Sequence, residues 1–311
     1  MTDPIPARQL LDSLNDALEL LSEFDRHPPM LDDRIEPLPN LIEQCVDLVS
    51  RAPTLEPIRV VHSLACTGGT LICKLLATLP NTMLLSEIDP LSRVQIGDAR
   101  NPRFAPTDLI YGARVAARSL DDAGAIRVFS AGLRALHVYT RETGLHLVLR
   151  DHNHSHFHST TAFDTRPTLR TIVQALAPVR SVVTVRHPLD SLLSLDNNGW
   201  RQFAPFTLSE YARRYLAFLD RHRGINVVRY EDLVEDPDGV LREICIQLEL
   251  PYTAEAKLLL PEMVMSGDSG RSSSKIGKRA RRAVPDWLAT ELPGCAPYEE
   301  LCVFLGYDPA V

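Results

Sequence analysis

Short runs of β-branched and other apolar residues recur along the middle of the chain, and helical patterns separate them. Residues 71–79 and 208–222 carry apolar side chains at the three- and four-residue spacing of amphipathic helices. The apolar runs predict five strands, at residues 57–63, 82–85, 146–149, 179–185 and 225–229. Strands that alternate with helices predict an α/β fold, with a central parallel sheet flanked by helices. Residues 89–143 have weaker strand signals, so we expect them to form helices that cover a sheet edge.

The first 50 residues have a different pattern. Leucines and alanines at helical spacing predict a helix over residues 7–24, and a second amphipathic helix is expected over residues 41–49. A proline-rich stretch around residues 27–39 separates the two. We expect residues 1–50 to form a helical extension whose apolar face packs on the main body. A homodimer formed through this extension remains an alternative.

Composition narrows the choice of partners and compartment. The 311 residues include 33 Lys and Arg against 40 Asp and Glu, a net charge of −7, which argues against a general nucleic-acid binder. The six cysteines contain no Cys-x-x-Cys pair, which favours free thiols in a reducing compartment. The N-terminus does not resemble a signal peptide, and no apolar run approaches the about 20 residues that span a bilayer. We therefore expect a soluble cytoplasmic protein without a membrane span.

A glycine-containing loop follows the first predicted strand. Residues 63–70 read Ser-Leu-Ala-Cys-Thr-Gly-Gly-Thr and lead directly into the helix over residues 71–79. A strand, a loop of small residues and a helix N-terminus together form a cradle for an anion, since backbone N–H groups converge there. An ordinary tight turn is the alternative. Gly69 is followed by Thr70 and Leu71 rather than by Lys and a hydroxyl residue, which disfavours an ATP or GTP hydrolase.

Two further clusters carry cations and hydroxyls. Arg186 follows the strand at 179–185, at the sheet edge where open α/β folds bind ligands, and Ser194 comes eight residues later. An arginine fork and a hydroxyl can hold one phosphate together. The run 271–282 contains six basic residues among twelve and follows Gly270. An ion-pair arginine and a solvated basic face are the alternative interpretations of these clusters.

In this order and spacing, the clusters resemble the sulfotransferase family of bacterial type, whose donor is 3′-phosphoadenosine 5′-phosphosulfate (PAPS). The segment Tyr230-Glu231-Asp232-Leu233, before Pro237, is similar to a further motif of that family. The resemblance implies a P-loop-like sulfotransferase fold in a single domain over residues 1–311, with a nucleotide-binding core at 57–285. It also implies the residues that contact the donor, namely Cys66, Thr67, Gly68, Gly69, Thr70, Leu71, Arg186, Ser194, Tyr230, Gly270 and Arg271.

The implied activity is transfer of the sulfuryl group of PAPS to a hydroxyl of a small molecule or glycan. The transfer is an in-line displacement that releases 3′-phosphoadenosine 5′-phosphate (PAP) and needs no metal. One residue departs from the family pattern, because Cys66 stands where the family has a cationic loop residue. Lys74, Arg150 and Arg271 are candidates to replace that charge. The alternatives are a non-catalytic nucleotide-binding protein on the same fold and, less favoured, a P-loop kinase.

The resemblance also implies two candidates for the catalytic base. Glu87 follows the second predicted strand, where several bacterial members carry a catalytic Glu, and we place it slightly ahead. His152 lies in Arg150-Asp151-His152, where cytosolic members have Lys-x-His. Imidazoles at alternate positions over residues 152–158 also raise the possibility of a zinc site, if the segment is extended. A loop that faces solvent or substrate is the favoured interpretation of that segment.

Overall fold

The computed structural model divides the chain into two compact units, residues 1–54 and 55–311. It describes residues 15, 16, 18, 19, 55–93, 108–160, 163, 165–263, 265, 276–278 and 280–310. The four described residues of the first unit are helical and fall within the helix expected over residues 7–24. The rest of the expected N-terminal extension lies outside the described residues. Among the described helices, none has the length and apolar character needed to cross a membrane.

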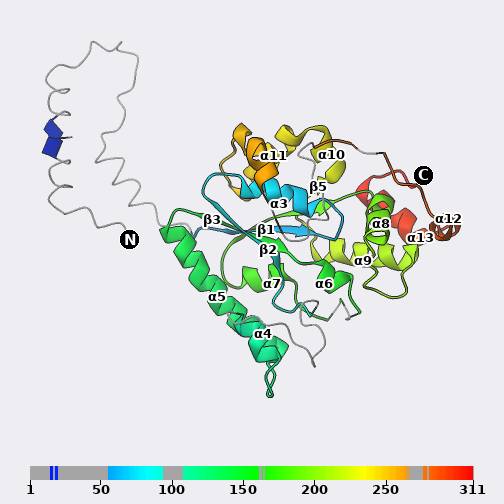
Figure 1. The fold of residues 1–311 in the computed structure, drawn as a ribbon, viewed down its shortest axis with the longest axis horizontal. Helices are drawn as coiled ribbons and strands as arrows, with labels where there is room; N and C mark the ends of the chain where they lie inside the picture. The colour runs from blue at the N-terminus through cyan, green and yellow to red at the C-terminus, as the bar shows by residue number, and fades with distance from the viewer. Residues whose placement is uncertain are drawn as a thin grey trace, which may run out of the picture. The chain divides into compact units, whose positions relative to one another are not determined.

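Five parallel strands form one sheet in the order β2-β3-β1-β4-β5 (Figure 1). The strands are β1 (Ile58–Ser63), β2 (Thr82–Ile88), β3 (His146–Asp151), β4 (Val179–Val185) and β5 (Asn226–Arg229). The predicted α/β class and all five predicted strands are confirmed. The pairing of β1 with β4 runs without interruption from Ile58 opposite Val179 to Ser63 opposite Thr184.

Helices connect and flank these strands. The two helices expected at 71–79 and 208–222 are present with nearly the expected bounds. The helices are α3 (Gly69–Ala77), α4 (Leu109–Arg114), α5 (Asp122–Glu142), α6 (His154–Phe157), α7 (Leu169–Gln174), α8 (Pro188–Asn197), α9 (Leu208–Arg221), α10 (Tyr230–Glu235), α11 (Pro237–Leu248), the 3₁₀ helix η1 (Ala254–Glu262), α12 (Asp286–Glu291) and α13 (Ala296–Leu305).

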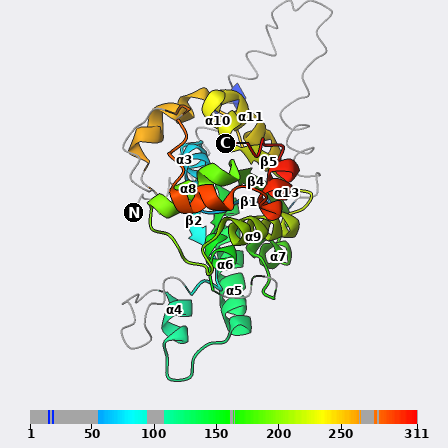
Figure 2. The same cartoon turned by 90° about the vertical axis from the view of Figure 1, so that its right-hand side faces the viewer.

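Helices cover both faces of the sheet. Successive residues of a strand point to opposite faces, so Val61 packs with apolar residues of α3 and α11 whereas Val60 packs with those of α5 and α7. The two ribbon views agree, with α3 and α11 on one side of the sheet and α5 and α7 on the other (Figures 1 and 2). This burial on both faces explains why the central strands read as nearly continuous apolar runs.

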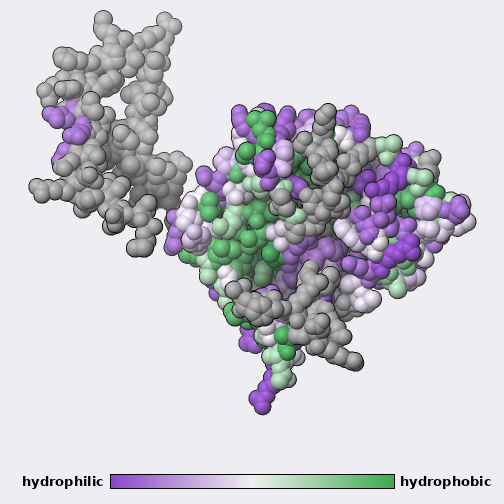
Figure 3. Space-filling view, viewed as in Figure 1, coloured by the Kyte–Doolittle hydropathy of each residue, from purple (hydrophilic) through white to green (hydrophobic). Residues whose placement is uncertain are grey.

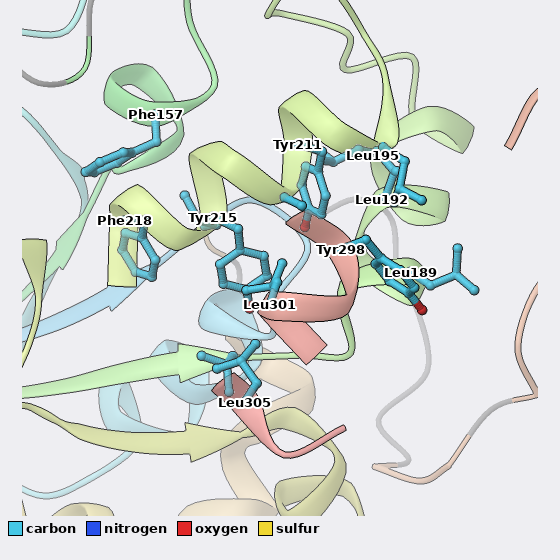
Figure 4. Close-up of a cluster of buried hydrophobic side chains, with 14 of the residues drawn as sticks. Phe157, Leu189, Leu192, Leu195, Tyr211, Tyr215, Phe218, Tyr298, Leu301 and Leu305 are labelled. Atoms are coloured by element: carbon cyan, nitrogen blue, oxygen red, sulfur yellow. The ribbon is translucent and has the colours of Figure 1, made fainter. Parts of the chain in front are cut away.

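A third apolar cluster extends the α7 side of the sheet. Its side chains come from α6, α8, α9 and α13 and point toward one another around Tyr215 (Figure 4). The hydroxyl of Tyr215 accepts a hydrogen bond from the backbone N–H of Arg186, 3.1 Å away. The side chains of Ser191 on α8 and Tyr211 on α9 are also hydrogen-bonded, at 2.6 Å. The cluster thereby fixes the turn between β4 and α8, so that Arg186 in the turn and Ser194 on α8, two of the predicted site residues, are held in place.

The strand order places a topological switch point at one edge of the sheet. Because the strands are parallel, the loops that follow them all lie at the carboxyl edge. From β1 the chain crosses toward β2 on one side, and from β4 it crosses toward β5 on the other. Open α/β sheets bind ligands where the connections that follow two neighbouring strands run in opposite directions in this way. The loop after β1 and the turn after β4 therefore meet at the expected position of a site.

Candidate functional site

The loop between β1 and α3 fits its surroundings only with glycines at two positions. Gly68 has a φ of +98°, and a Cβ there would lie 2.8 Å from Cδ2 of Tyr230. A Cβ on Gly69 would lie 2.2 Å from Oγ of Ser63. Gly68 is the N-cap of α3 and offers no side chain to the first N–H groups of the helix. The turn therefore places the positive end of α3 at the carboxyl edge of the sheet, which suits an anion.

Two guanidinium groups converge on one hydroxyl beside this loop. Nη1 of Arg186 and Nη1 of Arg282 each donate to Oγ of Ser194, and both distances are 3.2 Å. Arg186 also reaches the carbonyl oxygen of Cys66, at 3.4 Å. The neighbouring Arg281 pairs instead with Asp190, also on α8. Hydrophilic side chains predominate on the surface over α8 and α13 (Figure 3). The fork and hydroxyl predicted from sequence are thus in contact, and a third donor group joins them.

Tyr230 packs against Arg186. Its ring is 4.8 Å from the guanidinium carbon of Arg186 and only 8% of the residue is exposed. The same ring limits the space at Gly68. Tyr230 therefore contacts the predicted loop and the predicted arginine, and it acts as a packing surface for both.

Arg150 connects the loop to the acidic side of the site. Its Nη2 donates to Oγ1 of Thr70 at 2.9 Å, and its Nη1 lies 2.7 Å from Oε1 of Glu87. Nη1 is also within 3.3 Å of Oγ of Ser86. Arginine carries its donors in a fixed planar fork, so one side chain holds both partners in a defined geometry. Arg150, one of the three cations considered for the position of Cys66, thus contacts the loop through Thr70.

Glu87 lies at an irregularity of β2. The pairing of β2 with β3 shifts between Leu85 and Ile88, and Glu87 has a φ of +61°, which is rare for a residue with a side chain. Burial raises the pKa of Glu87 above its ordinary range, whereas the charge of Arg150 acts in the opposite direction. The bulge turns the carboxylate toward Arg150 and toward the histidines that follow β3.

The two candidate bases are neighbours. Nε2 of His152 lies 3.3 Å from Oε2 of Glu87 and 2.5 Å from Nε2 of His154. Burial lowers the pKa of His152 to about 4, and it lowers the pKa of His154 as well. The structure therefore unites Glu87 and His152 in one group.

The segment that follows His152 is not the extended loop that the zinc interpretation required. Residues 154–157 form the short helix α6. Nε2 of His156 lies 2.8 Å from the carbonyl oxygen of Phe163, and His158 packs against Phe203. His152 and His154 therefore meet, whereas His156 and His158 have other partners, so the four histidines do not converge on one point.

A second polar group is buried under the ends of β1 and β3. Nδ1 of His62 lies 2.7 Å from Oδ2 of Asp151, and the ring of His222 packs on that of His62 with centroids 4.4 Å apart. Burial lowers the pKa of both imidazoles to about 3 and raises that of Asp151 to about 7. Neutral, hydrogen-bonded groups are the form that such a buried position stabilises.

The remaining predicted residues divide into three sets. Thr67 is fully buried and holds the loop, since its hydroxyl donates to the carbonyl oxygen of Leu64 at 2.9 Å. Leu71 packs against the core beneath α3, and Cys66 contributes its carbonyl oxygen to Arg186. Gly270 and Arg271 lie outside the described residues. Sequence reasoning placed Arg282 in the basic run that resembles the family's loop over the 3′-phosphate, and His154 in the alternation of histidines, but it named neither as a site residue.

Comparison with known proteins gives one family. The model of the sulfotransferase family matches residues 57–254. The sulfotransferase domain of the Synechococcus PCC 7002 olefin synthase is 20% identical, with a TM-score of 0.47 over 83% of this chain and 97% of that chain. Sulfotransferase STF9 from Mycobacterium avium is 15% identical, with a TM-score of 0.43 over 85% and 80%. Mouse sulfotransferase SULT7A1, solved with PAP, is 12% identical, with a TM-score of 0.40 over 80% and 84%. No curated protein matches the chain.

Proposed function

Because the chain belongs to the sulfotransferase family, whose model matches residues 57–254, we propose that it transfers the sulfuryl group of PAPS to a hydroxyl. The acceptor is a small molecule or a glycan. PAPS, when bound, supplies the sulfuryl group and leaves as PAP, so the protein must bind two anionic groups and accept one proton. Three parts of the site correspond to these three tasks.

The observation that carries the proposal is the convergence of Arg186 and Arg282 on Ser194 beside the glycine loop. Two guanidinium groups 3.2 Å from one hydroxyl form a donor-rich corner that suits a phosphate with two negative charges. At Gly68 and Gly69 the loop packs too closely on Tyr230 and Ser63 to accept a Cβ, and its backbone lies at the N-terminus of α3. A donor with one anionic group at each end, as in PAPS, fits a site with two separate anion-binding parts.

Arg150 is proposed to replace the cation that is missing at Cys66. Negative charge grows on the leaving group as sulfuryl transfer proceeds, and a fixed cation nearby stabilises that charge. Arg150 is 2.9 Å from Thr70 on the loop and is only 7% exposed, so its charge acts in a setting of low dielectric. In this proposal Arg150, on the neighbouring strand β3, therefore supplies the positive charge that Cys66 lacks.

Glu87 is proposed to accept the proton of the acceptor hydroxyl. Arg150 holds its Oε1 at 2.7 Å and also contacts the loop, so the base and the donor cradle are fixed by one side chain. This arrangement leaves Oε2 on the side of His152, at 3.3 Å. We propose that His152 orients the carboxylate and the acceptor hydroxyl. In this assignment the two candidate bases act as a pair, with Glu87 receiving the proton.

Calorimetry with nucleotides tests the donor assignment. PAP is expected to bind the full chain at one site, and ATP is expected to bind far more weakly than PAP. Adenosine 5′-phosphate (AMP), which lacks the 3′-phosphate, should bind with an affinity that is measurable but lower than that of PAP. Tight ATP binding without PAP binding would refute the proposal and favour a kinase. A non-catalytic nucleotide-binding protein, which Cys66 suggested, would bind PAP without transferring label from PAPS.

A further inference from the structure

Three potential metal ligands from three segments meet next to the glycine loop. They are Glu87 on β2, His152 after β3 and His154 at the start of α6, and one ligand atom from each lies within 4.8 Å of the others. Two imidazoles and one carboxylate are a common ligand set for zinc and related ions. Since two imidazolium cations cannot stand 2.5 Å apart, at least one of the rings is neutral and has a lone pair available.

The distances suit one small ion after a modest side-chain movement. Bonds from zinc to nitrogen or oxygen are about 2.0–2.2 Å, so two ligand atoms of a tetrahedral ion stand about 3.3 Å apart. Nε2 of His152 and Oε2 of Glu87 already have a separation of 3.3 Å. The two histidine nitrogens are closer, at 2.5 Å, and must separate slightly. His154 can provide this movement because its side chain is the most exposed of the three, at 24%.

The surroundings of Glu87 resemble those of a metal-binding carboxylate. Arg150 holds Oε1 at 2.7 Å and leaves Oε2 directed to the histidines. Ligand carboxylates are commonly held in this way by groups that do not touch the ion. The backbone at Glu87 is in the left-handed region, with φ +61°, so its direction is set by the fold and not by a flexible side chain alone. Three protein ligands leave a fourth position open on the side of His154.

The buried group of His62, Asp151 and His222 has ligand atoms within the same distance, yet it lacks these features. Nδ1 of His62 and Oδ2 of Asp151 are joined directly at 2.7 Å, and Nδ1 of His222 lies 2.7 Å from the carbonyl oxygen of Phe218. All three residues are at most 4% exposed. This group is fully enclosed and its closest ligand atoms are already joined to each other, whereas the group at Glu87 has a partly exposed member in His154.

We propose that Glu87, His152 and His154 form a binding site for one divalent transition-metal ion of the zinc class. The binding itself does not depend on the proposed function. Its consequence for turnover does rest on that function, because the ion would occupy the lone pairs of Glu87 and His152 that serve the acceptor hydroxyl. A bound ion is therefore expected to inhibit sulfuryl transfer.

Titration of the metal-free full chain with Co²⁺ alone tests the site. We expect one ion per chain, with the visible absorption of a four- or five-coordinate ion, and release of Co²⁺ when Zn²⁺ is added. The variants His154→Ala and Glu87→Gln should each bind on the order of 100-fold more weakly, as loss of a ligand or its support commonly does. His146→Ala is the matched control, because His146 lies at the opposite end of β3 and should bind Co²⁺ like the wild type.

Several results would overturn the site. They are absence of Co²⁺ binding to the wild type, wild-type affinity in both variants, or a strong thiolate charge-transfer band that assigns the ion to cysteine. Thermal unfolding of each metal-free variant separates loss of a ligand from loss of the fold. His154→Ala is expected to melt at the wild-type temperature, and Glu87→Gln, which removes the counter-charge of Arg150, at a lower temperature but still in one cooperative transition.

Inhibition is measured separately, as the ratio of transfer rates with and without Zn²⁺ in the wild type and in His154→Ala. This ratio is expected to be one tenth or less in the wild type and near one in the variant. Equal ratios in the two proteins would refute the inhibition. A chain that binds Co²⁺ as described but transfers no sulfuryl group would refute the proposed function and leave the metal site intact.

Discussion

Arg150 determines how the loop and the acidic group relate to each other. One guanidinium contacts Thr70 at 2.9 Å and Glu87 at 2.7 Å, so in the proposed mechanism the same charge serves the leaving group and holds the base. Lysine has no planar fork and could not make both contacts with the same geometry. At the residue scale, the site is therefore one connected unit that begins at the loop and ends at His152.

Removing the side-chain function of either Glu87 or His152 should strongly reduce sulfuryl transfer without preventing donor binding. General-base catalysis contributes about 10²- to 10⁴-fold, so Glu87→Gln and His152→Ala are expected to lower kcat within that range. The affinity for PAP should stay near the wild-type value, because neither side chain contacts Arg186 or Ser194 in the structure. Transfer assays and PAP calorimetry on the same preparations measure both quantities. Near-normal turnover in both variants would remove Glu87 and His152 from the mechanism.

Gly68→Ala tests the shape of the loop. A left-handed backbone costs a residue with a side chain about 1–2 kcal/mol, and the new Cβ would also press on Tyr230. We expect the free energy of unfolding in urea to fall by at least that amount, together with the affinity for PAP.

Gly132→Ala provides the matched control for the loop variant. Gly132 lies within α5, and outside the backbone of its own helix no atom stands within 4 Å of the position that a Cβ would take. This change should leave the stability unchanged or raise it by up to about 1 kcal/mol, since alanine favours helix. A similar loss in both variants would show that the cost at Gly68 has nothing to do with the loop.

At the scale of elements, local pattern sufficed for the strands but not for how the elements meet. The β-branched runs predicted β4 at its observed bounds, because a strand buried on both faces has a distinctive composition. The bulge that turns Glu87 toward His152 depends on pairing with β3, and no single-strand pattern encodes it. Likewise, Ser194 and Arg282 are 88 positions apart and meet only through folding. Sequence reasoning therefore predicted the pairing of Arg186 with Ser194, but not the contact of Arg282 with Ser194 or of Glu87 with His152.

The contact between the C-terminal segment and α8 predicts a specific loss of donor affinity. Arg282→Ala removes one charged hydrogen bond to the proposed phosphate corner, worth about 1.5 kcal/mol or about tenfold in PAP affinity. The affinity for AMP should not change, because that nucleotide has no 3′-phosphate. Arg281→Ala is the control, since Arg281 pairs with Asp190 and should leave both affinities unchanged. An equal loss for PAP and AMP would contradict the assignment of this corner to the 3′-phosphate.

At the scale of the whole molecule, an acidic chain holds a compact set of cations at one sheet edge. The net charge of −7 is an average over the chain, and it coexists with a corner where Arg186 and Arg282 meet. Large polyanions meet the acidic surroundings, whereas a small anion needs only the corner. This distribution agrees with a nucleotide-sized partner, and it explains why overall charge alone could not identify one.

The protein should become less stable in acid because several buried imidazoles stay neutral in the folded state. The contribution of one of them, His158, can be measured separately. Neither ring nitrogen of His158 has a hydrogen-bond partner among the described residues, and burial together with Arg214 lowers its pKa to about 3. Below about pH 6.5, His158 is protonated in the unfolded chain but stays neutral in the folded chain. The free energy of unfolding therefore decreases as the pH falls from 6.5 toward 3. The slope is about 1.4 kcal/mol per pH unit for each such group.

The variant His158→Phe should lose this dependence. Relative to its difference from the wild type at pH 7.5, the variant is expected to gain about 2.7 kcal/mol at pH 4.5, two pH units below the unfolded-state pKa. Urea unfolding of both proteins at the two pH values gives this number. A difference between the proteins that does not change with pH would contradict a buried neutral His158.

The most direct test of the account is transfer of radioactive sulfur from labelled PAPS to a panel of hydroxyl-bearing small molecules and glycans. Wild-type protein is expected to move the label to at least one acceptor and to release PAP in equal amount. Glu87→Gln, with unchanged PAP affinity, should transfer the label at a rate at least about 100-fold lower. Transfer at the same rate by Glu87→Gln, or transfer of labelled phosphate from ATP in place of sulfur from PAPS, would contradict the account.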